Sequence, residues 1–324
     1  MKYAITGATG FVGGAVATQL RHAGHEVVAL VRAPERATAL AEAECRLVAG
    51  DLGDEASLDE LCAGAAGLFH VAGWYKLGSR APDEAGRINV DGTRAVLAAA
   101  RRAGVARTVY TSTLAVNSDT RGEVVDEQYR FGGEHLSVYD RTKAAAHEVA
   151  GAAIRDGQDV VIVQPGLVYG PGDTSQTGGL IAATVAGDRP LVPDAGGVCW
   201  GYIDDIAAGH VEAINRGRPG ESYFLAGPVA TLATGLRMAA KIAGVKGPRI
   251  VPTGAIRVMA AVGRVAAFLP LPPDYSAESL RAATASYLGT AAKAQRELGW
   301  HARDMQDGLT LTVAALASQR RGRS

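Results

Sequence analysis

Two side chains in this sequence have the types and the spacing of a proton-transfer pair. Tyr139 and Lys143 lie four positions apart in the segment Tyr139-Asp140-Arg141-Thr142-Lys143. Positions i and i+4 of a helix share one face, so the phenol and the ammonium would face the same site. A phenol with an unperturbed pKa of about 10 is too weak an acid to protonate an alkoxide readily at neutral pH. A neighbouring ammonium favours the phenolate, so we predict that Tyr139 donates a proton and that Lys143 lowers its pKa.

Three consecutive hydroxyl residues, Thr111, Ser112 and Thr113, stand at the end of the predicted strand Arg107–Thr111. Open α/β sheets bind ligands at the carboxyl ends of their strands, so these hydroxyls are placed to hold a substrate oxygen. Hydroxyl-rich strand ends also form turns, and the run alone does not separate the two roles. Its position, with Thr113 lying 26 residues before Tyr139, favours the oxygen-binding role.

A glycine motif near the amino terminus, Thr6-Gly7-Ala8-Thr9-Gly10-Phe11-Val12-Gly13, lies between a predicted strand and a predicted helix. In that context it predicts a site for the pyrophosphate of a dinucleotide, although a chain with 41 glycines could also place a plain turn there. Gly7 would permit the tight turn, Gly10 the approach of backbone to the phosphates, and Gly13 close packing of helix on strand. The N–H groups and the dipole of the helix would then attract the phosphates.

The identity of the dinucleotide depends on the end of the second predicted strand, Glu26–Val31. NAD sites place an acid there to bind the ribose 2′-hydroxyl, whereas an arginine accommodates the 2′-phosphate of NADP. Here the strand is followed by Arg32, with Arg36 one helical turn later and Glu35 beside it. The sequence therefore favours NADP(H) over NAD(H).

A second contact with the same cofactor is expected after the third strand. Asp51 and Leu52 follow that strand and are placed to contact the adenine. The alternative is that Asp51 caps the helix that follows it.

The elements that must position these residues alternate between strand and helix, which predicts an α/β fold with a parallel sheet and helices on both faces. The predicted strands are Lys2–Thr6, Glu26–Val31, Arg46–Ala49, Gly67–Val71, Arg107–Thr111, Asp159–Gln164 and Glu221–Leu225. The predicted helices are Phe11–Ala23, Pro34–Ala43, Glu55–Ala63, Glu84–Ala103 and Val138–Ile154.

Beyond Pro165, loops rich in glycine and proline separate isolated helices, and this change marks a second unit. We predict a Rossmann-type domain over residues 1–165 and about 198–227. Residues 166–197 and 228–324 would form a smaller, mostly helical substrate lobe. Its candidate lining residues are Trp200, Met259, Phe268 and Leu269, all of which could equally be core residues.

The composition favours a small-molecule partner. Lysine plus arginine and aspartate plus glutamate both number 33, so no charge excess attracts nucleic acid or an anionic membrane. The three cysteines (Cys45, Cys62 and Cys199) show no CxxC spacing, which favours a reducing cytoplasm and predicts no metal site. The amino terminus does not resemble a signal peptide, and Arg257 and Arg264 interrupt the most apolar segment, Gly254–Leu271, so no membrane span is predicted.

Taken together, the motifs resemble the extended short-chain dehydrogenase/reductase family over nearly the whole chain. They are the glycine motif, Asp51-Leu52, Phe69-His70-Val71-Ala72-Gly73, Asn89-Val90-Asp91-Gly92-Thr93, the Tyr110–Val116 run, the Tyr139–Lys143 segment, Pro165–Asp173, Tyr202–Ala207 and Glu297–Trp300.

The resemblance implies a role for each matching residue. Thr113 would be the catalytic hydroxyl, with Ser112 as the fallback. Lys143 would also bind the nicotinamide ribose, and His70 would be structural. The expected cofactor contacts are Gly7, Thr9, Gly10, Phe11, Val12, Gly13, Arg32, Asp51, Leu52, Val71, Ala72, Gly73, Thr111, Tyr139, Lys143, Pro165, Gly166, Leu167 and Val168.

Within the family, the stretch Gly197–Tyr202 separates the branches. Epimerases and dehydratases of nucleotide sugars carry arginines there that clamp a pyrophosphate, whereas this stretch is uncharged. The chain is closer to the dihydroflavonol-reductase-like branch, which implies NADPH-dependent reduction of a ketone or aldehyde. A nucleotide-sugar epimerase or dehydratase and a 3-beta-hydroxysteroid dehydrogenase-like activity are the alternatives. The resemblance also allows a homodimer through the helices Glu84–Ala103 and Val138–Ile154.

Overall fold

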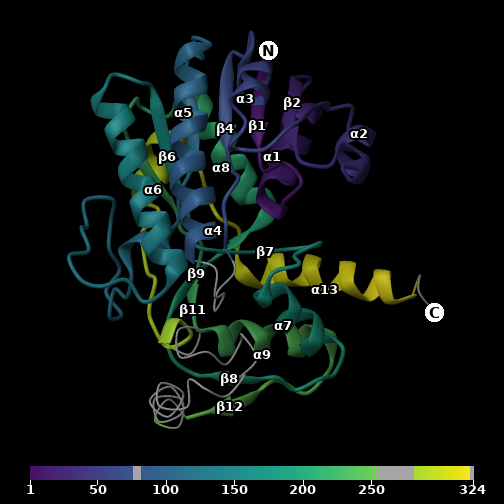
Figure 1. The fold of residues 1–324 in the computed structure, drawn as a ribbon. Coiled ribbons are helices and arrows are strands. Elements are labelled where there is room, and N and C mark those ends of the chain that lie inside the picture. The colour runs from purple at the N-terminus through teal and green to yellow at the C-terminus, as the bar shows by residue number, and fades with distance from the viewer. Residues whose placement is uncertain (76–81, 253, 255–280, 322–324) are drawn as a thin grey trace.

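The computed structural model describes residues 1–75, 82–252, 254 and 281–321 (Figure 1). Most of the predicted segment Gly254–Leu271 lies outside these residues, as do Met259, Phe268 and Leu269. Within the described ranges, no helix has the length and the apolar content needed to cross a membrane.

A seven-stranded parallel sheet with the order β10-β6-β5-β4-β1-β2-β3 forms the centre of the fold. Its strands are β1 (Lys2–Thr6), β2 (Glu26–Val31), β3 (Arg46–Ala49), β4 (Gly67–His70), β5 (Thr108–Thr111), β6 (Val160–Pro165) and β10 (Ser222–Leu225). The predicted strands are therefore confirmed, each end lying within one residue of the prediction. The strand near residue 222 returns to this sheet as expected and pairs with β6.

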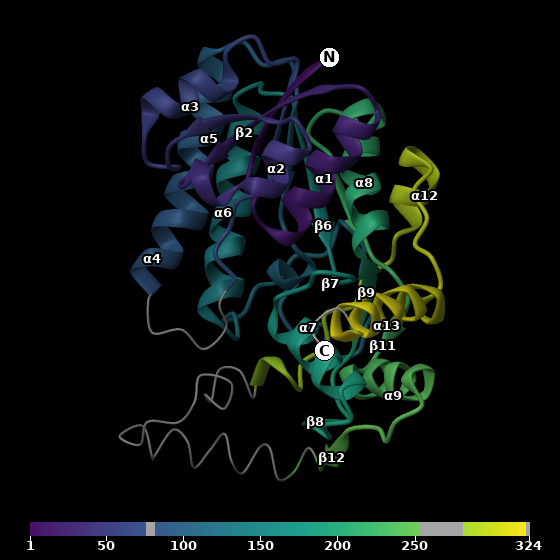
Figure 2. The same ribbon diagram turned by 90° about the vertical axis from the view of Figure 1, so that its right-hand side faces the viewer.

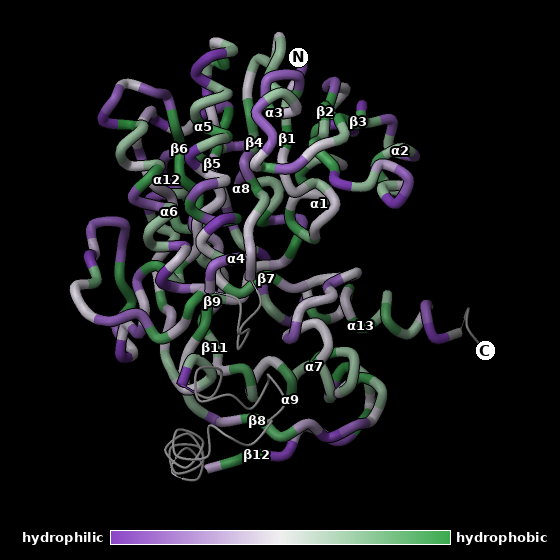
Figure 3. Tube along the Cα trace, viewed as in Figure 1, coloured by the Kyte–Doolittle hydropathy of each residue, from purple (hydrophilic) through white to green (hydrophobic). Residues whose placement is uncertain are grey.

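The strands have buried residues on both faces because helices cover both sides of the sheet. Ile5 packs in the cluster beneath α1 (Phe11–His22), whereas its neighbour Ala4 packs in the opposite cluster with α3 (Glu55–Cys62). This alternation follows from the two-residue period of a strand. Figure 3 shows apolar residues along the central strands and polar residues on the outer loops.

The helices form two outer layers (Figure 2). One layer holds α1, α8 (Ile203–Arg216) and α12 (Ala292–Leu298), and the other holds α3, α5 (Gly92–Arg102) and α6 (Val138–Arg155). These layers and the parallel sheet confirm the predicted Rossmann-type α/β fold.

Two predicted helices differ from the observed ones. The segment Pro34–Ala43 divides into a 3-10 turn, Pro34–Arg36, and a short helix α2, Thr38–Glu42, because Ala37 between them adopts φ −91° and ψ 40°, outside the α-helical region. The predicted helix Glu84–Ala103 consists of α4 (Pro82–Gly86), a π-helical turn over Arg87–Asp91, and α5.

Most of the remaining strands and α-helices contribute to a second apolar cluster below the sheet (Figure 1). These remaining elements are β7 (Leu167–Tyr169), α7 (Gln176–Val185), β8 (Leu191–Pro193), β9 (Val198–Tyr202), β11 (Val229–Ala230), α9 (Leu232–Ala243), β12 (Arg249–Val251) and α13 (Met305–Arg321). Trp200 belongs to this cluster with 1% exposure, so it is a core residue. The division of the chain into two domains stays a prediction.

Candidate active site

A cavity of about 800 Å³ opens at the carboxyl ends of the central strands. This volume falls in the range of about 300–1,000 Å³ that is typical of small-molecule sites. The predicted residues that line it are Gly7, Thr9, Gly10, Phe11, Val12, Gly13, Arg32, Asp51, Leu52, Val71, Ala72, Gly73, Thr111, Ser112, Tyr139, Lys143, Gly166, Leu167 and Val168. Pro165 and Thr113 lie outside this lining, Pro165 because it is the buried last residue of β6.

The glycine turn has the geometry of a phosphate cradle. Gly7 adopts φ +76°, and a Cβ atom placed there would lie 2.5 Å from the Ala72 nitrogen. A Cβ atom on Gly13 would collide with the carbonyl oxygen of Gly7 and lie 2.6 Å from its carbonyl carbon. These contacts leave no room for side chains inside the turn, so the chain passes close beneath the start of α1. The residues present therefore fit the pyrophosphate of a dinucleotide.

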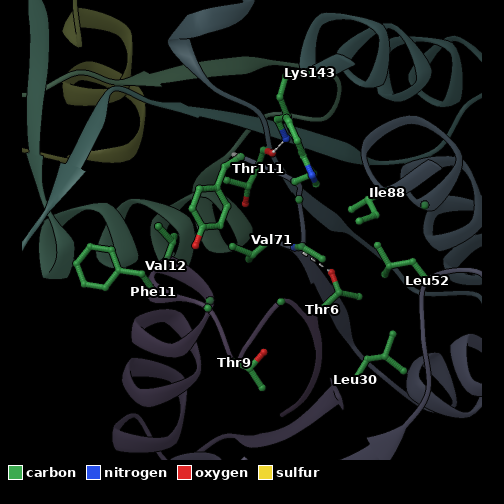
Figure 4. Close-up of a pocket in the computed structure, with 18 of the residues that line it drawn as sticks. Thr6, Thr9, Phe11, Val12, Leu30, Leu52, Val71, Ile88, Thr111 and Lys143 are labelled. Atoms are coloured by element: carbon green, nitrogen blue, oxygen red, sulfur yellow. Dashed lines mark hydrogen bonds between the residues drawn. The ribbon is translucent and has the colours of Figure 1, made fainter. Parts of the chain in front are cut away.

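The end of the cavity near β2 and β3 combines apolar and charged residues, because Leu30 and Leu52 line it beside Arg32 and Asp51. Figure 4 shows Ile88, Leu52 and Leu30 along one side of the cavity. The sequence did not single out Leu30 or Ile88, because an apolar residue in a strand or helix gives no sign that it borders a ligand cavity.

Asp51 does not cap the following helix. Its Oδ1 accepts a hydrogen bond of 3.2 Å from the Gly53 amide, while Asp54 caps α3 by accepting from the Ala56 amide. The exposed Asp51 carboxylate remains at the rim of the cavity, as does Arg32.

Lys143 is buried at the opposite end of the cavity. Its Nζ donates to the Thr111 carbonyl oxygen at 2.7 Å and to Tyr110 Oη at 3.3 Å (Figure 4 shows the first bond). Burial lowers the pKa of this ammonium to about 7. These two hydrogen bonds hold the Lys143 ammonium against β5. Lys143 lines the cavity together with Thr111 and Ser112.

Tyr139 lies one helical turn earlier on α6 and also faces the cavity. Burial raises its pKa to about 12, a hydrogen bond with Thr113 lowers it, and the negative charge of Asp140 raises it. Because Lys143 is directed at Thr111 and Tyr110, its lowering of the Tyr139 pKa stays a prediction for the cofactor complex.

The hydroxyl run divides between different partners. Thr113 interacts with Tyr139, and its Oγ1 also accepts from the Ala115 amide at 3.2 Å. Ser112 lies 3.0 Å from His147 Nδ1, one helical turn beyond Lys143. This arrangement favours Thr113 over Ser112 as the hydroxyl that works with Tyr139.

A buried asparagine joins the cavity wall to α6. Asn89 accepts from the Trp74 amide at 2.7 Å, donates to the Trp74 carbonyl at 3.1 Å, and donates to Thr142 Oγ1 at 2.9 Å. It belongs to the π-helical turn Arg87–Asp91, a type of distortion that is frequent at functional sites. The sequence marks Asn89 only as part of the family motif Asn89–Thr93, because its partners Trp74 and Thr142 lie 15 and 53 positions away.

His70 has the structural role predicted for it. Its side chain is fully buried and lies 2.8 Å from Thr6 Oγ1 and 3.0 Å from Thr93 Oγ1. Thr6 in turn accepts from the Ala72 amide, so the imidazole braces the end of β1 against the wall of the cavity.

Three histidines, of which His70 and His210 are fully buried, should make the fold less stable in acid. Burial lowers the pKa of His70 from 6.5 to about 3, and those of His147 and His210 to about 4. The folded chain therefore keeps them neutral, whereas the unfolded chain protonates them below about pH 6.5. The contribution of the neutral histidines to the free energy of unfolding is complete above about pH 6.5. It is lost as the pH falls, by up to about 1.4 kcal/mol per pH unit for each histidine.

Urea unfolding at pH 7 and pH 5 measures this loss. A His210→Gln variant should flatten the pH dependence, whereas the same change at the exposed His301 should not. Equal free energies of unfolding at both pH values would contradict the prediction.

The comparisons with known proteins agree with this geometry. Residues 3–226 match the model of the NAD dependent epimerase/dehydratase family. A protein of Synechocystis sp. named "Putative dihydroflavonol 4-reductase" is 35% identical over 307 residues, covering 91% of this chain and 88% of that protein. The 4-hydroxy-2-methyl-3-oxo-4-farnesyl-3,4-dihydroquinoline-1-oxide ketoreductase of Stigmatella aurantiaca is 33% identical over 319 residues, covering 94% and 92%. The crystal structure of gox2253 is similar with a TM-score of 0.87 at 32% identity and covers 99% of both chains.

Proposed function

We propose that this chain, which belongs to the NAD dependent epimerase/dehydratase family, is an NADPH-dependent reductase of a ketone or an aldehyde. It is an NAD(P)-dependent oxidoreductase of the extended short-chain dehydrogenase/reductase type. The assignment as an NADPH-dependent carbonyl reductase rests on the surroundings of Tyr139 and on the residues of strand β9.

In the proposed reaction, two side chains act on the carbonyl group, and a third acts on the cofactor and on Tyr139. When bound, the reduced nicotinamide supplies the hydride that the carbonyl carbon accepts. Tyr139 donates its phenolic proton to the carbonyl oxygen, and Thr113 hydrogen-bonds to the same oxygen and orients it. Lys143 binds the nicotinamide ribose and, as an ammonium, favours the phenolate that forms at Tyr139. The glycine turn holds the pyrophosphate so that these groups meet the substrate.

The observation that carries the choice of a carbonyl reductase is the apolar character of β9. A sugar nucleotide carries a diphosphate, whose recognition requires cationic side chains. At the corresponding stretch this chain has Cys199 and Trp200, which are buried at 0% and 1% exposure. Among the described lining residues of the cavity, the cationic side chains are Arg32, Arg87 and Lys143, all on the cofactor half of the chain.

An absorbance assay of the reduced nicotinamide tests the proposal. NADPH and NADH are each mixed with the purified protein and with panels of ketones, aldehydes and sugar nucleotides. We expect net NADPH consumption with carbonyl compounds. Interconversion of sugar nucleotides without net consumption would instead establish an epimerase or dehydratase and overturn the proposed reductase.

Replacing Arg32 tests the preference for NADP(H). Arg32 borders the cavity after β2, where its guanidinium would pair with the 2′-phosphate. Arg32→Ala should raise the KM for NADPH by about tenfold or more, because a charge-assisted hydrogen bond contributes about 1.5–3 kcal/mol. The KM for NADH should change little.

Arg36→Ala is the matched control, because Arg36 is exposed and lies outside the lining of the cavity. Steady-state kinetics of both variants with both cofactors separate the two arginines. An equal change in the KM for NADPH and the KM for NADH in Arg32→Ala would contradict the assignment.

A further inference from the structure

A segment distant in sequence from Tyr139 reaches the helix that carries it. Residues 284–291, which we call the bridging segment, run between the loop before Val125 and the start of β9. The Tyr287 amide donates to the Gly197 carbonyl at 2.8 Å, and the Thr120 amide donates to the Ser286 carbonyl at 2.7 Å. Backbone bonds on both sides therefore fix the position of Tyr287.

The side chain of Tyr287 meets the residue next to Tyr139. Its Oη donates to Asp140 Oδ2 at 3.2 Å, across 147 positions of sequence. Asp140 is 2% exposed, and its Oδ1 accepts from Ser137 Oγ at 2.7 Å. Two hydroxyl groups from different parts of the chain thus hold this buried carboxylate.

We propose that Tyr287 is a positioning residue, whose hydroxyl holds the Asp140 carboxylate and thereby sets the negative charge that Tyr139 experiences. This inference rests on the proposed role of Tyr139 as the proton donor. It assigns a function to the bridging segment, a part of the chain that none of the sequence motifs contains.

The electrostatics of the site give the proposal its direction. After burial, which raises the pKa of Tyr139 most, the charge of Asp140 raises it further. Burial and the neighbouring Asp140 also raise the pKa of Tyr287, so its hydroxyl keeps its proton and stays a donor. A donor to a carboxylate disperses its charge, and removal of the donor should increase the field at Tyr139.

The other titratable groups around Tyr139 and Asp140 stay in place in this test. They are Lys143 and His147 on α6, Tyr110 on β5, and Asp119 in the loop that contacts the bridging segment. None of them is altered by the changes described below, so a shift in the titration of Tyr139 reports on Tyr287 and Asp140.

The test compares Tyr287→Phe with the wild type in the direction of alcohol oxidation, which needs the Tyr139 phenolate. The midpoint of the pH–rate profile should move upward by about half a pH unit or more, which corresponds to about threefold slower oxidation below the midpoint. Asp140→Asn should move the midpoint downward, and Tyr287→Phe should cause no further shift in the Asp140→Asn background. Tyr223→Phe is the matched control, because Tyr223 also donates to a carboxylate, Glu297 Oε2 at 3.0 Å, but on β10.

A second readout does not require turnover. In the complex with NADP⁺, the tyrosinate absorbance that is missing from Tyr139→Phe reports the ionisation of Tyr139 itself, and its midpoint should rise in Tyr287→Phe. An unchanged midpoint in both measurements would overturn the inference. So would a shift by Tyr287→Phe that is equally large in the wild-type and in the Asp140→Asn background. Absence of any nicotinamide-linked turnover in the wild type would instead contradict the proposed function, while the absorbance titration would still decide the role of Tyr287.

Discussion

Replacing Tyr139 with phenylalanine should reduce the turnover number by about 10²–10⁴-fold, the range expected for loss of a general acid. Phenylalanine keeps the ring, and therefore the packing of the aromatic side chain against the cavity, but it removes the hydroxyl that interacts with Thr113. The proton for the carbonyl oxygen would then have to come from water. NADPH affinity should stay nearly unchanged, because the glycine turn and Lys143 are not altered.

Single-turnover absorbance decay measures the chemical step, and a fluorescence titration of NADPH measures cofactor binding. Tyr3→Phe is a suitable control, since Tyr3 lies near the start of β1, whereas the cavity lies at the carboxyl end of that strand. The Oη atom of Tyr3 contacts Met1 Sδ at 3.3 Å. Turnover of Tyr139→Phe at the wild-type rate would rule out the proposed mechanism.

Adding a single methyl group at Gly13 should weaken cofactor binding by at least about tenfold and destabilise the fold by about 1–3 kcal/mol. The Cβ atom of Gly13→Ala would collide with the Gly7 carbonyl oxygen and would lie 3.0 Å from the Ala8 nitrogen. Gly7 cannot move away easily, because it is close to the Ala72 backbone on its other side. The turn would have to open, and its N–H groups would no longer converge on a pyrophosphate.

Gly179→Ala provides the matched control in another helix. Its Cβ atom would meet no heavy atom within 4 Å, and alanine favours a helix interior by up to about 1 kcal/mol over glycine. Thermal unfolding and titration with NADPH should therefore show lower stability and weaker NADPH binding for Gly13→Ala. Gly179→Ala should bind NADPH as the wild type does. Unchanged affinity in Gly13→Ala would contradict the assigned function of the turn.

The sequence by itself determined those parts of the protein that depend on local geometry or on a period. The short apolar run Lys2–Thr6 predicts a strand, and the spacing of Gly7 and Gly13 predicts a turn beneath a helix. The four-residue spacing of Tyr139 and Lys143 places both residues on one face of α6. In each case the residues that matter are close in sequence, so their types and spacing restrict the structure directly.

Only the tertiary structure decided which side chains work together. Thr113 and Ser112 are neighbours with similar hydroxyls, yet one interacts with Tyr139 and the other with His147. The asparagine that links the Trp74 backbone to α6 and the tyrosine that holds Asp140 have ordinary residue types with no periodic pattern around them. Their hydrogen bonds join positions that only folding brings together, and the direction of a hydrogen bond depends on packed neighbours that no local pattern encodes.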